Sequence, residues 1–196
     1  MKELEAIGTK ALRARVFSQS VAMAFEVNVD ISRSADNSAF ISEAEKYYLT
    51  LQFAPPADNR EYGWNSEGSI LMKLSQNEAM ALASVFLRIK PTLKIEKRKT
   101  THRTHQAYKN ITIGPNDRGG LLVTSGIVPV ERGSFKPINY NLPVTQMDCV
   151  STGLFLLGFL TLKMPWVSSE SIITALRLSE SKSCQCVKNL QFLAKN

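Results

Sequence analysis

Residues 69–89 read SILMKLSQNEAMALASVFLRI, a segment in which the hydrophobic pattern changes from that of a strand to that of a helix. Ser69 to Leu74 has the pattern of a short strand. The next four residues, Ser75-Gln76-Asn77-Glu78, form a capping-box pattern in which the first and last side chains satisfy each other's backbone N–H groups. The apolar residues from Ala79 to Ile89 then predict a helix, which Pro91 ends. The stretch therefore predicts a strand, a helix cap and an apolar helix in direct succession.

The same succession returns in the second half of the chain, where Thr145 lies 70 residues after Ser75. A strand pattern at Ile138 to Val144 precedes this threonine, and an apolar helix is predicted from Cys149 to Leu162. The matched order indicates an internal duplication within a single domain, residues 1–166, with halves at about 8–91 and 92–166. Residues 167–196 are rich in Ser, Lys and Gln, and we expect a partly helical tail with a short helix at 171–178.

Strand patterns precede each predicted helix. Apolar residues occupy every second position from Val21 to Ile31, which predicts a long strand with one buried face. Tyr47 to Phe53 predicts another strand, which Pro55 and Pro56 end. In the second half, strands are predicted at residues 92–99, 108–113, 121–130 and 138–144. Groups of strands followed by single helices predict an α+β fold.

Positive charge is concentrated at the start of the second half. Residues 88–109 hold eight basic residues and one acid, Glu96, a net +7 that equals the net charge of the whole chain. A local positive field indicates a polyanionic partner more strongly than a diffuse basic bias does. Nucleic acid, an acidic protein and an anionic membrane surface all satisfy this observation.

Several classes of protein are disfavoured by composition. Three cysteines, of which Cys184 and Cys186 are separated by one residue, predict neither a disulfide framework nor a zinc site, and favour a reducing compartment. The most apolar run, Val150 to Leu162, is shorter than the roughly 20 residues that span a bilayer. We expect an intracellular protein without membrane association, cytoplasmic if bacterial or viral in origin and otherwise organellar (mitochondrial).

No catalytic constellation is evident in the sequence. His102 and His105 have no third metal ligand nearby, and Gly119-Gly120 lacks the spacing of a phosphate-binding loop. The sequence therefore predicts a binding protein without enzymatic activity, metal or cofactor.

Candidate nucleic-acid-binding residues are cations that can neutralise phosphates and aromatic rings on which bases can stack. The cations are Lys94, Lys97, Arg98, Lys99, Arg103 and Lys109, and the rings are Tyr47, Tyr62, Trp64 and Tyr108. For each single ring, burial in the core is the competing interpretation, and for the basic segment it is a solvated face.

A resemblance to a known family joins these features. Leu51-Gln52-Phe53-Ala54-Pro55 and Arg60-x-Tyr62-x-Trp64, with the strand and capped helix that follow, resemble the Whirly family of single-stranded DNA-binding proteins. The resemblance returns from Leu142 to Trp166. It implies two four-stranded antiparallel sheets, each followed by a helix, related by a pseudo-twofold internal repeat. It also implies homotetramers formed through the helices, with single strands bound along the exposed sheet surfaces. The same superfamily includes the kinetoplastid mitochondrial guide-RNA-binding proteins and PC4-like domains.

The sequence departs from the plant members of this family in two places. Gly8-Thr9-Lys10-Ala11-Leu12 only approximates a lysine-rich motif of the family, on which the assignment of Lys10 as a binding residue rests. The acidic, aromatic C-terminal tail of the plant proteins is replaced by a mildly basic one.

Three hypotheses follow from these observations. The first is a sequence-tolerant single-stranded DNA-binding protein in DNA protection, recombination or repair; the second is an RNA-binding, annealing protein of the same fold; the third is a scaffold whose basic face docks an acidic protein. Apolar helix residues exceed what one sheet face covers, so we also expect burial of some of them between subunits. These residues are Met80, Val85, Phe86, Phe155 and Phe159.

Overall fold

The computed structural model describes residues 12–30, 43–58, 61–102 and 104–193, with side chains described as far as residue 181. The first half contains β1 (Arg13–Phe17), β2 (Ala22–Val29), the short 3-10 helix η2 (Glu43–Lys46), β3 (Tyr47–Ala54), β4 (Ile70–Leu74) and α1 (Gln76–Phe86). The second half contains β5 (Leu93–His102), β6 (His105–Pro115), β7 (Leu121–Pro129), β8 (Ile138–Val144) and α2 (Gln146–Lys163), and α3 (Ser169–Leu193) follows.

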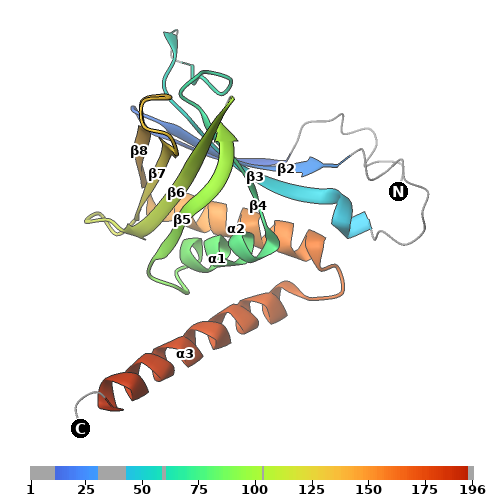
Figure 1. Cartoon of the computed structure of the whole chain (residues 1–196). Helices are drawn as coiled ribbons and strands as arrows, with labels where there is room; N and C mark the ends of the chain where they lie inside the picture. Colours follow the sequence, from blue (N-terminus) through green and yellow to red (C-terminus); the bar gives the residue numbers. More distant parts are fainter. Residues whose placement is uncertain (1–11, 31–42, 59–60, 103, 194–196) are drawn as a thin grey trace, which may run out of the picture.

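The strands form two four-stranded antiparallel sheets, with orders β1-β2-β3-β4 and β5-β6-β7-β8. We call them sheet 1 and sheet 2. Each is a simple meander that leads directly into a helix, so the two halves repeat the same order of elements. Figure 1 shows the strands of sheet 2 crossing over those of sheet 1, with α1 and α2 side by side beneath both. The predicted α+β arrangement of two four-stranded antiparallel sheets, each followed by a helix, is confirmed.

Both helices begin at the predicted caps. The Ser75 hydroxyl accepts from the Glu78 backbone N–H at 3.3 Å, and the Glu78 carboxylate accepts from the Ser75 N–H at 2.7 Å. At α2 the Thr145 hydroxyl accepts from the Asp148 N–H at 3.2 Å. An N-cap satisfies backbone donors that the helix itself leaves unpaired, so each cap fixes where its strand gives way to a helix.

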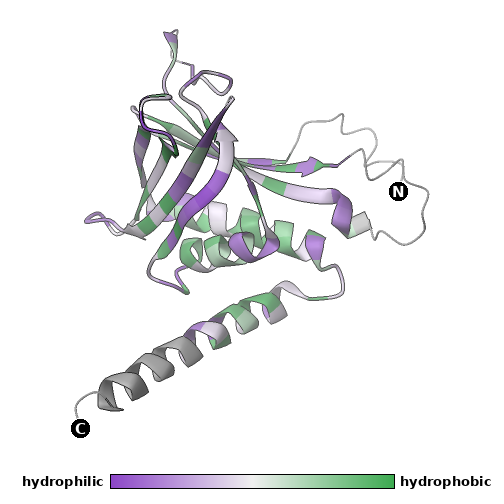
Figure 2. Cartoon of the chain, viewed as in Figure 1, coloured by the Kyte–Doolittle hydropathy of each residue, from purple (hydrophilic) through white to green (hydrophobic). Residues whose placement is uncertain are grey.

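The hydrophobic core lies between the two sheets and the helix pair. Figure 2 shows hydrophobic residues concentrated along α1 and α2, whereas β5 is largely hydrophilic. Phe25 of sheet 1 packs edge-on against Phe86 of α1, with ring centres 5.9 Å apart. Val85 and Phe86 are completely buried within the single chain, and Phe159 is 4% exposed. These three residues are therefore already covered within the chain, so of the five, some of which were expected to be buried between subunits, only Met80 and Phe155 keep partial exposure.

Helix α1 ends at Phe86, earlier than the predicted Ile89. Arg88 adopts a φ of 60°, and the N–H groups of Ile89 and Lys90 both donate to the Ser84 carbonyl. This left-handed turn is a common way for a helix to end, although glycine usually occupies the turning position. The Arg88 guanidinium donates to the Gly119 carbonyl at 2.6 Å, which ties the turn to sheet 2.

The tail contains a longer helix than the expected one at 171–178, since α3 runs from Ser169 to Leu193. Its first turns pack on the core through Ile172 and Leu176, and Glu180 forms an ion pair with Lys90 at 3.2 Å. Among the described residues, no helix combines the length and apolar character needed to cross a membrane.

Candidate nucleic-acid interface

The outward face of sheet 1, which points away from the helices, carries cations at both edges and small side chains between them. Alternation along the strands sends every second residue to this face. Its three rows are Arg13-Glu26-Thr50-Lys73, Arg15-Ala24-Gln52-Leu71 and Phe17-Ala22-Ala54. Arg13 is paired with Glu26 at 2.6 Å, and the Lys73 ammonium lies 4.1 Å from the centre of the Tyr48 ring.

The connection between β3 and β4 folds back over one end of this face. The Gln52 side chain donates to the Trp64 carbonyl, and the Tyr62 hydroxyl donates to the Ser18 carbonyl. The Tyr62 ring centre lies 5.4 Å from that of Phe17 and 6.4 Å from that of Trp64. The Arg15 guanidinium lies 5.5 Å from the Trp64 ring, a cation–π distance. We call Arg15, Phe17, Tyr62 and Trp64 the aromatic cluster. Phe17 is 55% exposed, whereas Tyr62 and Trp64 are half-buried, so each ring keeps some surface open to solvent.

The outward face of sheet 2 carries lysines along its edge strand, β5. A bulge between Ile95 and Arg98 places two residues opposite Asn110, and the Lys97 N–H donates to the Asn110 side chain at 2.7 Å. The exposed Lys94, Lys97 and Lys99, which we call the lysine row, lie on one side of the bulged strand or at the bulge itself. Tyr108 is the cross-strand partner of Lys99, so a ring stands beside the row.

The remainder of this face consists of small and polar residues. The rows that extend from the lysine row consist of Thr112, Thr124 and Asn141, and of Asn110, Gly126 and Asn139. The Asn139 side chain packs over Gly126, where a Cβ would lie 2.4 Å from the Asn139 side-chain oxygen. The Asn139 side chain thus covers the backbone at Gly126, and this face offers polar side chains to a ligand.

Arg98 and Lys109 point the opposite way, into the junction between the two sheets. The Arg98 guanidinium forms an ion pair with Glu78 at 2.6 Å and donates to the Lys73 carbonyl. The Lys109 ammonium donates to the Leu71 carbonyl and, at 3.3 Å, to the Thr100 hydroxyl. These carbonyls lie on β4, the edge strand of sheet 1, whose outer groups have no further strand to pair with. The two cations thus fasten sheet 1 to sheet 2.

Lys109 is the more enclosed of these cations, with 7% of its surface exposed. Burial lowers the pKa of its ammonium, and the neighbouring Arg98 guanidinium lowers it further. The structure therefore divides the predicted basic segment into an outward lysine row and an inward pair.

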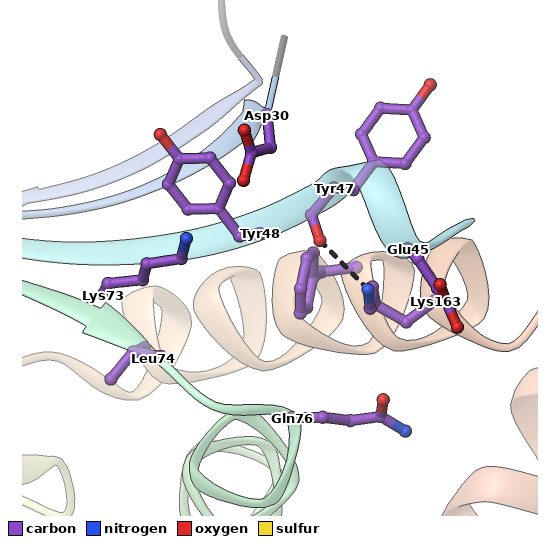
Figure 3. A pocket seen from close by; sticks show the side chains of 9 residues that line it. Asp30, Glu45, Tyr47, Tyr48, Lys73, Leu74, Gln76 and Lys163 are labelled. Carbon is purple, nitrogen blue, oxygen red and sulfur yellow. Dashed lines mark hydrogen bonds between the residues drawn. The ribbon is translucent and has the colours of Figure 1, made fainter. Parts of the chain in front are cut away.

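The remaining predicted residues lie apart from both faces or outside the described residues. Tyr47 opens β3 beside a pocket, where its carbonyl accepts from the Lys163 ammonium at 3.1 Å (Figure 3). Tyr62 and Trp64 lie together in the aromatic cluster of sheet 1, whereas Tyr108 lies on β6 of sheet 2. Lys10 and Arg103 fall outside the described residues.

Sequence reasoning missed Arg15 and Phe17, which complete the aromatic cluster. Their strand, β1, buries only Val16 fully, so it has no run of alternating apolar residues by which to find it. The pattern that could have identified this strand is the spacing of two residues in Arg13-x-Arg15-x-Phe17, which places all three side chains on one face.

A four-stranded meander followed by a capped helix, repeated once with both sheets turned outward, defines this as a Whirly-like fold. Three solved structures of Whirly proteins share it. WHY1 from Arabidopsis thaliana matches with a TM-score of 0.58 and 15% identity over 80% of this chain and 92% of that chain. WHY3 from the same plant matches with a TM-score of 0.60 and 17% identity, over 85% of this chain and 96% of that chain. The plant transcriptional regulator PBF-2 matches with a TM-score of 0.60 and 18% identity, over 80% of this chain and 84% of that chain. No protein-family model matches the sequence, and neither does any curated protein.

Proposed function

We propose that this chain binds single-stranded nucleic acid, DNA in preference to RNA, and catalyses no reaction. Its role would lie in DNA protection, recombination or repair. The observation that carries the proposal is the pair of outward sheet faces, one with the lysine row beside Tyr108 and the other with the aromatic cluster. Exposed lysines neutralise phosphates, and exposed rings stack on unpaired bases without regard to sequence.

An unpaired strand fits these faces better than a duplex does. Stacking on Phe17, Tyr62 or Trp64 requires a base with a free π-face, which a duplex offers only at its ends. The polar side chains around Gly126 add hydrogen-bonding groups to this face. The preference for DNA rests on the resemblance to the Whirly family, and the description of PBF-2 as a plant transcriptional regulator is compatible with a role on DNA.

The binding test is fluorescence anisotropy at low salt with labelled strands of about 30 nucleotides, which exceed the roughly 4–16 nucleotides that one single-strand-binding fold covers. We expect submicromolar affinity for oligo(dT), weaker affinity for oligo(U) and the weakest for a DNA duplex of equal length. Micromolar or absent binding to oligo(dT) would overturn the proposal. An equal or higher affinity for the RNA strand would favour the annealing-protein hypothesis instead.

We further propose that the chain assembles into a homotetramer through its helices. Met147, Val150 and Leu154 lie along one side of α2 and are 75%, 44% and 58% exposed. They recur at intervals of three and four residues, so they form one continuous apolar stripe. Covering this stripe with a neighbouring subunit removes apolar surface from water, which favours association.

Light scattering at micromolar concentration tests the assembly. The wild-type chain should have a tetramer's mass, and Leu154→Glu, which places a charge within the stripe, should reduce it. The matched control is Leu178→Glu, since Leu178 is 57% exposed but lies on α3. A monomeric wild type, or an equal loss in both variants, would contradict the proposal.

A further inference from the structure

A pocket opens at the end of sheet 1 where β3 begins, and Figure 3 shows the side chains that line it. The lining comes from α1 and α2, from strands β3 and β4, from Asp30 after β2 and from Glu45 of η2. Two of its residues, Tyr48 and Lys73, also belong to the outward face of sheet 1, because they pair across the strands with Asn28 and Thr50. A strand that follows this face therefore reaches the pocket.

The pocket has an apolar floor and an aromatic wall. Leu74 and Phe159 line it and are 6% and 4% exposed, so their accessible surface is confined to small patches. Tyr48 stands on the side toward the sheet face, with the Lys73 ammonium 4.1 Å from its ring centre (Figure 3). A flat heterocycle covers apolar surface and stacks on aromatic rings, whereas a phosphate does neither.

The polar groups of the pocket differ in whether they are already hydrogen-bonded within the protein. Lys163 is already engaged, because its ammonium donates to the carbonyls of Ala44 and Tyr47 at 2.8 and 3.1 Å and so holds one wall in place. Gln76 presents an amide that both donates and accepts, and no hydrogen bond from the described residues occupies it. Glu45 adds a carboxylate, which accepts only.

We infer that this pocket holds one unpaired base of the bound strand, and that it selects bases carrying an exocyclic amine: adenine, cytosine or guanine. The Glu45 carboxylate disfavours a phosphate beside it and accepts hydrogen bonds from such amines, while the Lys163 ammonium is already engaged by two carbonyls. The Gln76 amide complements a base edge that offers a donor beside an acceptor. Thymine and uracil present a carbonyl oxygen where cytosine has its amine, so a carboxylate placed against that position meets an acceptor instead of a donor. This inference rests on the proposed function.

The test compares oligo(dC) with oligo(dU) at mildly alkaline pH, since these strands differ in the amine and have the same size. Wild-type protein should bind oligo(dC) at least about fivefold more tightly, the lower end of what one good base-edge contact contributes. Gln76→Met and Glu45→Gln should abolish this ratio while leaving the affinity for oligo(dU) unchanged. Gln146→Met is the matched control, because Gln146 begins α2 as Gln76 begins α1 but does not line the pocket.

The outcomes separate this inference from the proposed function. Equal affinity of the wild type for both strands would contradict base selection by the pocket and leave the proposal of strand binding intact. A preference for oligo(dC) that persists in both pocket variants would also contradict base selection by the pocket. Loss of the preference in the Gln146→Met control would contradict it too. Absence of binding to either strand overturns both proposals together.

Discussion

Sheet 1 and sheet 2 are built by the same succession of four strands and a capped helix, yet their outward faces differ in chemistry. Sheet 1 presents Arg15 and three aromatic rings above a floor of alanines, whereas sheet 2 presents a row of lysines above threonine, asparagine and glycine. The duplicated order fixes the scaffold, and the outward residues are free to differ because the core does not depend on them. In the proposed complex, sheet 1 stacks on bases and sheet 2 neutralises phosphates.

The largest expected effect comes from the junction between the sheets. Lys109→Met keeps the aliphatic volume and removes the ammonium that donates to the Leu71 carbonyl. We expect a loss of about 2 kcal/mol in the free energy of unfolding, as for a hydrogen bond to a charged group. Urea denaturation measures it, and Lys99→Met on the outward face is the control, with a change under about 0.5 kcal/mol. Equal losses in the two variants would erase the distinction between inward and outward cations.

The next effect concerns the aromatic cluster. Trp64→Leu should weaken oligo(dT) binding about tenfold, since base stacking on one ring contributes about 1–3 kcal/mol. Anisotropy measures the change, and Trp166→Leu is the control because Trp166 is 74% exposed beyond the end of α2. If Trp64→Leu binds as the wild type does, sheet 1 takes no part in base stacking.

The helix caps test whether the two halves are equivalent as scaffolds. Ser75→Ala and Thr145→Ala each remove a hydroxyl that accepts a backbone N–H. Each should lower the free energy of unfolding by about 1 kcal/mol, with oligonucleotide affinity unchanged. Losses that differ several-fold would show that one half dominates the stability of the fold.

The smallest effect is a pH dependence of the junction. The pKa of Lys109 is lowered from its ordinary value of 10.5, so in the window between the folded and unfolded values the unfolded chain binds more protons. Stability therefore rises with pH in that window. The difference in free energy of unfolding between the wild type and Lys109→Met should increase toward pH 10.5. A difference that stays constant or decreases would contradict the lowered pKa.

Local patterns in the sequence were sufficient to predict the strand, cap and helix that end each half, whereas the two four-stranded sheets came from the resemblance to the Whirly family and β1 was not predicted. The caps at Ser75 and Thr145 and the strand at Ile138–Val144 depend on neighbouring residues, and all three are where the sequence placed them. The two outward faces were harder to predict, because one bulged position decides which way the following cations point. Beyond the bulge after Ile95, Arg98 faces inward and Lys99 outward. The aromatic cluster joins β1 to the connection after β3, a contact between distant segments that spacing alone does not reveal.

The salt dependence of oligo(dT) binding tests the division between the two faces most directly. Each phosphate neutralised on a single strand contributes a log–log slope of roughly −0.7, so Lys97→Ala/Lys99→Ala should reduce the magnitude of the slope by about 1.4. Arg118→Ala/Arg177→Ala, which removes two exposed charges from a turn and from α3, should leave the slope unchanged. An affinity independent of salt, or an equal change of slope in both double variants, would contradict the assignment of phosphate binding to the lysine row.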